Sequence, residues 1–212
     1  MLNPDPFEKY TGEYEAWFDK NHWAYESELE AVRSQLPERG KGIEIGVGSG
    51  RFAGPLGIKT GVDPSSTMRE LAEKRGIKTF DAKAEKLPFN DVSFDYALMV
   101  VTICFLNDAV AALRETYRIL KTDGVLVVGF VDKDSFLGKQ YQEKKSRSKF
   151  YQSARFYSVK EVIHMTQEAG FSQLNIVQTL FGDIQKMDAA DFFKEGYGQG
   201  AFVVLKVRKR GG

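Results

Sequence analysis

Apolar residues along this chain occur in short unbroken runs that alternate with segments in which they recur every three or four positions. The unbroken runs are typical of strands buried on both faces of a parallel sheet, whereas the wider spacing is typical of helices that pack on such a sheet. The predicted strands cover residues 43–47, 59–63, 77–80, 94–101, 125–131, 174–180 and 201–207. This alternation predicts a doubly wound α/β sheet.

Capping residues, glycines and prolines indicate where the helices between these strands begin and end. The predicted helices cover residues 51–56, 66–75, 109–120 and 159–169. Two pairs have the spacing of capping boxes, Thr67 with Glu70 and Ser158 with Glu161. Because of the first pair, the sequence does not fix whether the second helix starts at residue 66 or two residues later. The apolar stripe of the third helix ends at Leu120.

The first 35 residues are rich in aromatic side chains and contain both tryptophans of the chain. Tyr14, Trp17 and Phe18 share one helical face. The same spacing continues to Leu36, and the following proline and glycine end the helix. We therefore expect an N-terminal helical cap over residues 1–38, either docked on the core or acting as a lid over a bound ligand.

Charge and composition exclude several classes of function. The 212 residues carry 30 Lys and Arg against 29 Asp and Glu, and this net charge of +1 disfavours nucleic-acid binding through bulk electrostatics. One cysteine, Cys104, and two histidines make an internal disulfide impossible and a Cys/His zinc site implausible. The longest apolar stretch, residues 96–106, is too short for a membrane span of about 20 residues, and the amino-terminal residues lack the apolar stretch of a signal peptide. We expect one cytoplasmic domain over residues 1–212.

A glycine-rich loop, residues 46–50, follows the first predicted strand directly. Glycines let the backbone approach a ligand closely, and ligands of such sheets bind where the strands end. A dinucleotide would need an acid about 20 residues further on, but Asp63 follows Gly48 by 15. S-adenosylmethionine (SAM), with its sulfonium and ammonium groups, suits Glu44, an acid two residues ahead of the loop, better than a polyphosphate does. Asp63 can accept hydrogen bonds from both ribose hydroxyls or cap the next helix.

Five sequence blocks in order resemble the class I SAM-dependent methyltransferases, of the small-molecule type akin to the ubiquinone and menaquinone biosynthesis enzymes. The blocks are residues 44–50, 61–65, 84–89, 115–121 and 156–171. The resemblance implies a Rossmann-like sheet that is mostly parallel with an antiparallel last strand. It also implies SAM as cofactor, S-adenosylhomocysteine (SAH) as product, and a small-molecule acceptor.

The resemblance further implies which residues contact the cofactor. Those that border the methionine part, together with Glu44, are Gly46, Val47, Gly48, Met99 and Val100. Those around the adenosine are Asp63, Pro64, Ser65, Ala84 and Glu85. Lys83 stands where the family often has an acid, so the hydrogen bond from the adenine amino group falls to Asp81 or is absent.

Methyl transfer from SAM is an in-line displacement at a carbon already activated by the sulfonium, so proximity and alignment carry much of the catalysis. A general base is needed only when the acceptor must lose a proton early, and His22 is the candidate. Aromatic faces favour a cationic sulfonium, so Tyr14, Trp17 and Phe18 are candidate lid residues. The resemblance places residues 132–157, which mix aromatic and basic side chains, over the active site as a substrate-side insertion.

Three alternatives stay open. A SAM-binding protein without catalysis would keep Glu44, the glycine loop and Asp63 but would show no turnover. An NAD-dependent oxidoreductase would bind NAD(H), and it leaves residues 84–89 unexplained. RNA or protein methylation is disfavoured by the neutral charge and by residues 96–99, which differ from an Asn-Pro-Pro-Tyr amino-group motif. The sequence indicates neither the acceptor atom nor the oligomeric state.

Overall fold

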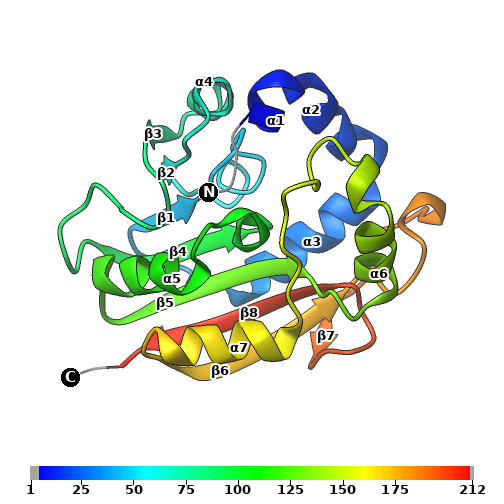
Figure 1. The fold of residues 1–212 in the computed structure, drawn as a ribbon. Coiled ribbons are helices and arrows are strands. Elements are labelled where there is room, and N and C mark those ends of the chain that lie inside the picture. The colour runs from blue at the N-terminus through cyan, green and yellow to red at the C-terminus, as the bar shows by residue number, and fades with distance from the viewer. Residues whose placement is uncertain (1–4, 211–212) are drawn as a thin grey trace.

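The computed structural model describes residues 5–210, and within them eight strands form one sheet (Figure 1). The strands are β1 Gly42–Ile45, β2 Thr60–Val62, β3 Lys78–Phe80, β4 Phe94–Val100, β5 Leu120–Val131, β6 Phe171–Thr179, β7 Lys194–Glu195 and β8 Phe202–Lys209. Their order is β3-β2-β1-β4-β5-β8-β6-β7. Neighbours from β3 to β5 pair in parallel, whereas β8 is antiparallel to β5 and β6. The predicted mostly parallel sheet with an antiparallel last strand is therefore confirmed.

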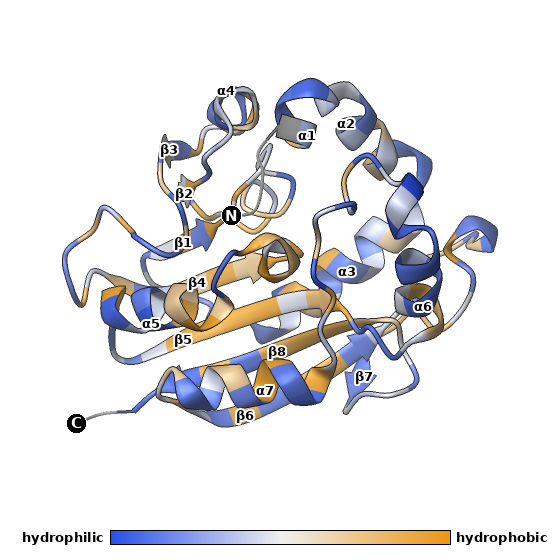
Figure 2. Cartoon of the chain, in the orientation of Figure 1, coloured by the Kyte–Doolittle hydropathy of each residue, from blue (hydrophilic) through white to orange (hydrophobic). Residues whose placement is uncertain are grey.

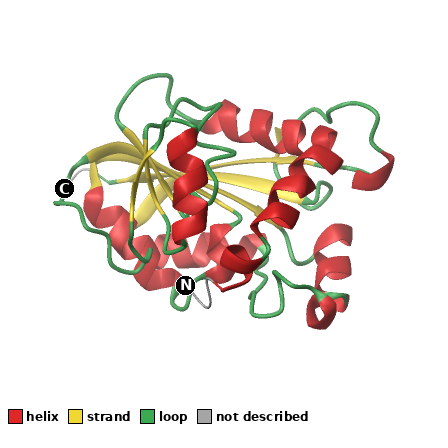
Figure 3. Cartoon of the chain, turned by 90° about the horizontal axis from the view of Figure 1, so that it is seen from above, coloured by secondary structure: helices red, strands yellow, loops and turns green. Residues whose placement is uncertain are grey.

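Helices cover both faces of this sheet, as the view from above shows (Figure 3). The α-helices are α1 Asp5–Lys9, α2 Thr11–Lys20, α3 His22–Gln35, α4 Ser66–Lys74, α5 Ala109–Ile119, α6 Phe136–Glu143 and α7 Val159–Glu168. Short 3-10 helices are η1 Thr102–Phe105, η2 Lys145–Arg147 and η3 Ile184–Lys186. α5 and α7 pack on one face and α3 on the other, which confirms the doubly wound arrangement. The first residues of the predicted N-terminal cap, 1–4, lie outside the described residues.

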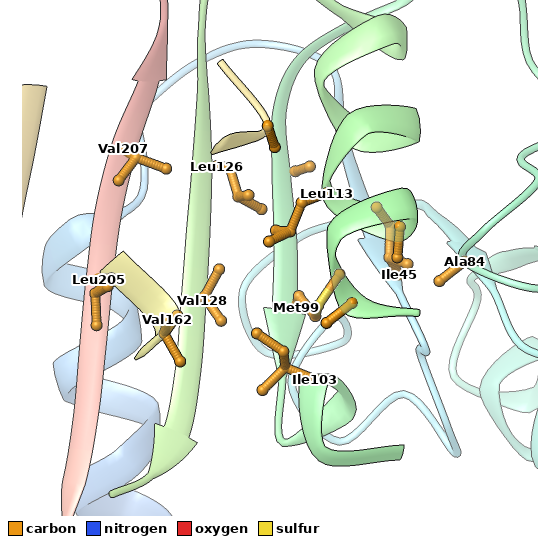
Figure 4. Close-up of a cluster of buried hydrophobic side chains, with 14 of the residues drawn as sticks. Ile45, Ala84, Met99, Ile103, Leu113, Leu126, Val128, Val162, Leu205 and Val207 are labelled. Atoms are coloured by element: carbon orange, nitrogen blue, oxygen red, sulfur yellow. The ribbon is translucent and has the colours of Figure 1, made fainter. Parts of the chain in front are cut away.

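Side chains of successive strand residues point to opposite faces, and the packing of β4 follows this rule. Met99 packs with Leu113 and Ile103 on the side of α5 (Figure 4). Leu98 and Val100 belong instead to the layer beneath α3. Figure 2 shows β4 and β5 as hydrophobic strands. The core therefore forms two layers, one on each side of the sheet.

The predicted helix over residues 51–56 is wrong, because these residues form successive turns. Pro55 has no N–H to donate to the Arg51 carbonyl, its partner in a continuous α-helix. The Tyr25 hydroxyl of α3 donates to that carbonyl instead, at 2.5 Å. Gly57, with a φ of 75°, then ends the turns. The segment after the glycine loop is thus fixed by a contact from α3 rather than by its own helix.

The N-terminal helix, predicted to continue to Leu36, is divided in two. α2 ends at Lys20 and α3 begins at His22, because Asn21 leaves the helical conformation with a ψ of 43°. The side-chain amide of Asn21 donates to the Trp17 carbonyl at 2.9 Å, which satisfies a carbonyl at the end of α2. The chain can therefore turn between the two helices.

Four smaller features complete the comparison with the sequence. The predicted capping box of Ser158 and Glu161 is confirmed. α4, however, is capped by Ser65 and not by Thr67. Leu120 is the first residue of β5 rather than the last position of a helical stripe. The two-residue strand β7 was not predicted.

Within residues 5–210, no helix has both the length and the apolar character that crossing a membrane requires.

We expect Met99→Ala to lower the free energy of unfolding by about 2–5 kcal/mol, because it empties a fully buried position between β4 and α5. Urea denaturation followed by circular dichroism measures the change. Met165→Ala, at a partly buried position on α7, is the matched control and should lose less. Equal losses in the two variants would contradict the packing described for Met99.

Candidate functional site

A cavity of about 260 Å³ opens where β1, β4 and β5 end. Its wall combines the glycine loop, the N-terminal helices α2 and α3, and the segment after β5. The residues predicted from the sequence that line it are Tyr14, Trp17, Phe18, Glu44, Gly46, Val47, Gly48, Asp63, Ser65 and Val100. The segment after β5 contributes Tyr141, Phe150 and Tyr151. The structure therefore brings most of the predicted residues together in one place.

The glycine loop is held open toward the cavity by hydrogen bonds to β2 and its end. The N–H groups of Gly46 and Val47 both donate to the Val62 carbonyl, at 2.8 and 2.9 Å. Gly48 has a φ of 51°, a left-handed conformation that glycine adopts without strain. A Cβ at Gly48 would come within 3.3 Å of the Tyr14 hydroxyl. Glycine at this position therefore keeps the space between the loop and α2 free.

Asp63 connects the end of β2 to the glycine loop. Its Oδ2 accepts the Gly48 N–H and its Oδ1 accepts the Ser65 N–H, each at 2.9 Å. Burial raises the pKa of Asp63 to about 6, although these backbone hydrogen bonds act to lower it. A carboxylate oxygen has two lone-pair sites, so each oxygen can still accept a hydrogen bond from a ligand. Asp63 therefore faces the cavity, whereas the cap of the next helix, the other role that the sequence allows for it, belongs to Ser65.

Glu44 is a carboxylate inside the buried strand β1, and it is 2% exposed. Its Oε2 has no hydrogen-bond partner in the described part of the chain. Burial raises the pKa of Glu44 well above its usual value, the Ala53 backbone lowers it in part, and the neighbouring Asp63 raises it further. A buried carboxylate oxygen without a partner is costly, and a ligand that carries a cation or a donor would satisfy it.

Several predicted residues do not line the cavity. Met99 and Ala84 lie in the core layer on the α5 side, since Met99 points to the opposite face from Val100. Glu85 accepts the Asn107 N–H at 2.9 Å. Pro64 is also absent from the wall, and so is His22, which lies exposed at the start of α3 with its ring against Trp23. Within residues 5–210, no group of three or more His, Cys, Asp and Glu could hold a metal ion.

Glu15 of α2, which the sequence analysis did not single out, ties the N-terminal helices to the glycine loop. Its carboxylate accepts a hydrogen bond from the Ser49 hydroxyl, and it pairs with Arg51 at 2.8 Å and Arg75 at 2.6 Å. Arg75 also donates to the Ser49 carbonyl at 2.5 Å. These contacts hold α2 over the loop and bring Tyr14 to the cavity.

Glu28 of α3 also lines the cavity, and the sequence analysis missed it. It is 5% exposed, and burial alone raises its pKa to about 8. Glu28 lies four residues after Ala24 and four before Val32, both of which are fully buried. A carboxylate at a core position of an amphipathic helix is a signal that the sequence contains.

Comparisons with known proteins point in one direction. A family model described as a methyltransferase domain matches residues 43–128. An uncharacterised protein of Methanocaldococcus jannaschii is 49% identical over 203 residues, which cover 96% of this chain and 98% of that protein. A demethylmenaquinone methyltransferase of Staphylococcus aureus is 25% identical over 64% of this chain and 69% of that enzyme.

A solved structure from Thermotoga maritima resembles the chain over its whole length. It is a SAM-dependent methyltransferase described as a possible histamine N-methyltransferase. The two chains are 50% identical, the TM-score is 0.96, and the match covers 98% of this chain and 100% of the other. A sequence identity of 50% over nearly the whole chain shows that the two proteins share a family as well as a fold.

We expect the ligand-free protein to become less stable as the pH rises from about 5 to about 8. Glu28, Asp63 and Glu44 all have raised pKa values in the folded state. The folded protein therefore binds more protons than the unfolded chain in this interval, and the free energy of unfolding falls with pH. Thermal unfolding at several pH values measures the slope.

Glu28→Gln removes one of these groups and should flatten the slope. Glu30→Gln is the matched control, because Glu30 is exposed on the same helix and forms a surface ion pair with Arg33 at 3.1 Å. The same slope in wild type and Glu28→Gln would mean that Glu28 titrates as an ordinary carboxylate.

Proposed function

We propose, from the premise that the chain belongs to the SAM-dependent methyltransferase family, that it methylates a small-molecule acceptor enclosed between its N-terminal helices and residues 132–157. The observation that carries the proposal is one cavity in which the glycine loop, Asp63 and the partnerless Oε2 of Glu44 meet. These residues fit SAM, because the ligand brings the donors and the cation that the two carboxylates lack.

The cofactor is held, in this proposal, by residues of the cavity wall. Glu44 accepts a hydrogen bond from the ammonium group, and Asp63 accepts the ribose hydroxyls with the lone pairs that its backbone contacts leave. Gly48 admits the ligand close to the backbone, and the Tyr14 ring faces the cationic part. When bound, SAM supplies a methyl group on a sulfonium that is ready for in-line displacement. We propose no direct contact for Met99, Pro64, Ala84 or Glu85, since the cavity wall does not include them.

The acceptor side is formed by side chains that exclude water. Trp17, Phe105 and Tyr151 line it, and the rings of Phe105 and Tyr151 are stacked with centroids 5.8 Å apart. An enclosed apolar wall of this kind suits a small molecule with a flat or apolar body. The chain's own contribution to catalysis is then to align the acceptor and to exclude water.

We further propose that the chain works as one domain in the cytoplasm. Cys104 supports that location, because it is a free, buried thiol that a reducing compartment preserves. His22 has no place in this mechanism, since it lies away from the cavity wall.

Calorimetric titration with SAM, SAH and NADH tests the cofactor assignment. SAM and SAH should bind with micromolar affinity, about −8 kcal/mol, and NADH should not bind. Formation of SAH in the presence of small-molecule acceptors, followed by mass spectrometry, then separates an enzyme from a protein that binds SAM without turnover. Binding of NADH alone would overturn the assignment.

We expect Glu44→Gln to weaken SAM binding by about 1–3 kcal/mol, because the amide lacks the charge that pairs with the ammonium group. Calorimetry against wild type measures the loss. Glu70→Gln, at an exposed position of α4, is the control and should bind SAM as wild type does. Unchanged affinity in Glu44→Gln would reject the electrostatic role.

A further inference from the structure

Glu28 is a second buried carboxyl group in the cavity, and the proposed cofactor contacts do not use it. Its side chain lines the cavity from α3 and is 5% exposed. It forms no hydrogen bond or ion pair with another residue in the described part of the chain. The remaining buried face of α3 packs on the sheet, and Ala24 and Val32 on either side of Glu28 are completely buried.

The surroundings of Glu28 differ from those of Glu44. Burial and then the Glu28 carboxylate raise the pKa of Tyr141 on α6, and Glu28 also contributes to the raised pKa of Tyr151. The charge of Glu44, in contrast, affects Tyr14 of α2. Burial raises the pKa of Tyr14 most, and the negative charges of Glu44 and Asp63 raise it further. Glu28 enters the cavity from α3, whereas Glu44 enters it from β1, directly before the glycine loop.

No charged group of the described chain neutralises Glu28. The titratable side chains that line the cavity are Glu13, Tyr14, Glu28, Glu44, Arg51, Asp63, Tyr141 and Tyr151. Arg51 is the cation among them, and it is paired with Glu15 at 2.8 Å. A buried carboxyl without a partner lowers stability, and an apolar residue of similar size at this position would not. The group that satisfies Glu28 must therefore come from outside the chain.

Aromatic rings line the same cavity as this carboxyl group. Tyr141 and Tyr151 stack with centroids 5.1 Å apart and an interplanar angle of 23°. Ring faces attract organic cations, most strongly where water is excluded. A carboxylate and several ring faces in one enclosed wall form the recognition pattern of an alkylammonium group. A neutral acceptor would leave the carboxyl group unsatisfied.

We infer that Glu28 binds the methyl acceptor, and that this acceptor is an organic amine, cationic at neutral pH, with an apolar or aromatic body. The inference rests on the proposed function, because it assigns the acceptor side of the same cavity. The Glu28 carboxylate pairs with the ammonium group, while Tyr151 and Trp17 contact the body. Glu44 stays with the cofactor, so each of the two carboxylates has its own cation.

Glu28 can also take the proton that an ammonium group must lose before its nitrogen becomes a nucleophile. An N–H bond of the ammonium breaks, an O–H bond forms at the Glu28 carboxylate, and the electron pair stays on nitrogen. A carboxylate whose pKa burial raises is basic enough to hold that proton. The carboxylate oxygens of Glu28 therefore both bind the ammonium group and accept its proton.

The test uses full-length protein saturated with SAH, so that the Glu44 side is occupied. Binding of 2-phenylethylamine and 2-phenylethanol, which differ by one polar group, is measured by calorimetry in wild type, Glu28→Gln and Glu28→Asp. Wild type should prefer the amine by about tenfold or more, which is about 1.4 kcal/mol. Glu28→Gln should lose the preference, and Glu28→Asp should keep part of it. Glu30→Gln is the control and should match wild type.

Proton release separates this role from a structural one. In the SAH-bound protein, the empty acceptor side holds Glu28 in its protonated form at neutral pH, so pairing with a cation releases that proton to the buffer. The measured enthalpy of amine binding should therefore change with the ionisation enthalpy of the buffer in wild type but not in Glu28→Gln. The melting temperature of Glu28→Gln should equal or exceed that of wild type, because a buried carboxyl without a partner is removed.

The outcomes are distinguishable. Failure of wild type to bind SAM or SAH would overturn the proposed function and the inference with it. SAH binding without any preference for the amine, including no binding of either probe, would overturn the inference alone. A preference that persists in Glu28→Gln, or a variant that melts well below wild type, would also overturn it, because Glu28 would then be a structural residue.

Discussion

Glu44 is a carboxylate in a strand whose two faces are both buried. The organisation of the site depends on which of the two core layers receives its side chain. In the parallel pairing of the sheet, Glu44 lies between Gly61 of β2 and Leu98 of β4. Ile43 and Ile45 on either side pack in the α5 layer, so alternation directs Glu44 into the layer beneath α2 and α3. The cavity has to form there, because nothing within the sheet can satisfy a carboxylate.

The same layer receives Glu28 from the opposite side, so that one cavity contains two buried carboxyl groups. Burial raises the pKa of both groups, and Asp63 is a third carboxyl group of the cavity whose pKa burial raises. Glu15 acts in the other direction, because its contacts with Ser49, Arg51 and Arg75 fasten α2 over the loop. The ion pairs of Glu15 thus lie outside the cavity, between α2 and the loop, whereas Glu28 and Glu44 face its interior.

The half of the cavity that we propose for the cofactor could be predicted from the sequence, because its signals are local. The run from Glu44 to Gly50 and the end of β2 at Asp63 are contiguous motifs, and apolar runs located the strands that carry them. The error at residues 51–56 arose where a distant contact decides the conformation, because Tyr25 supplies a hydrogen bond to the Arg51 carbonyl that Pro55 cannot make. Met99 lies outside the cavity wall because strand alternation turns it to the opposite face from Val100.

The proposed acceptor half had no comparable local motif, because it is assembled from single residues far apart in the chain. Trp17, Phe105 and Tyr151 come from three different segments, and no local motif joins them. Only the resemblance indicated that residues 132–157 belong here. Glu28 is the exception, since a carboxylate on the buried stripe of α3 contradicts the helical pattern around it. A carboxylate at a buried position of a covering helix is therefore the sequence feature from which the proposed acceptor site could have been found.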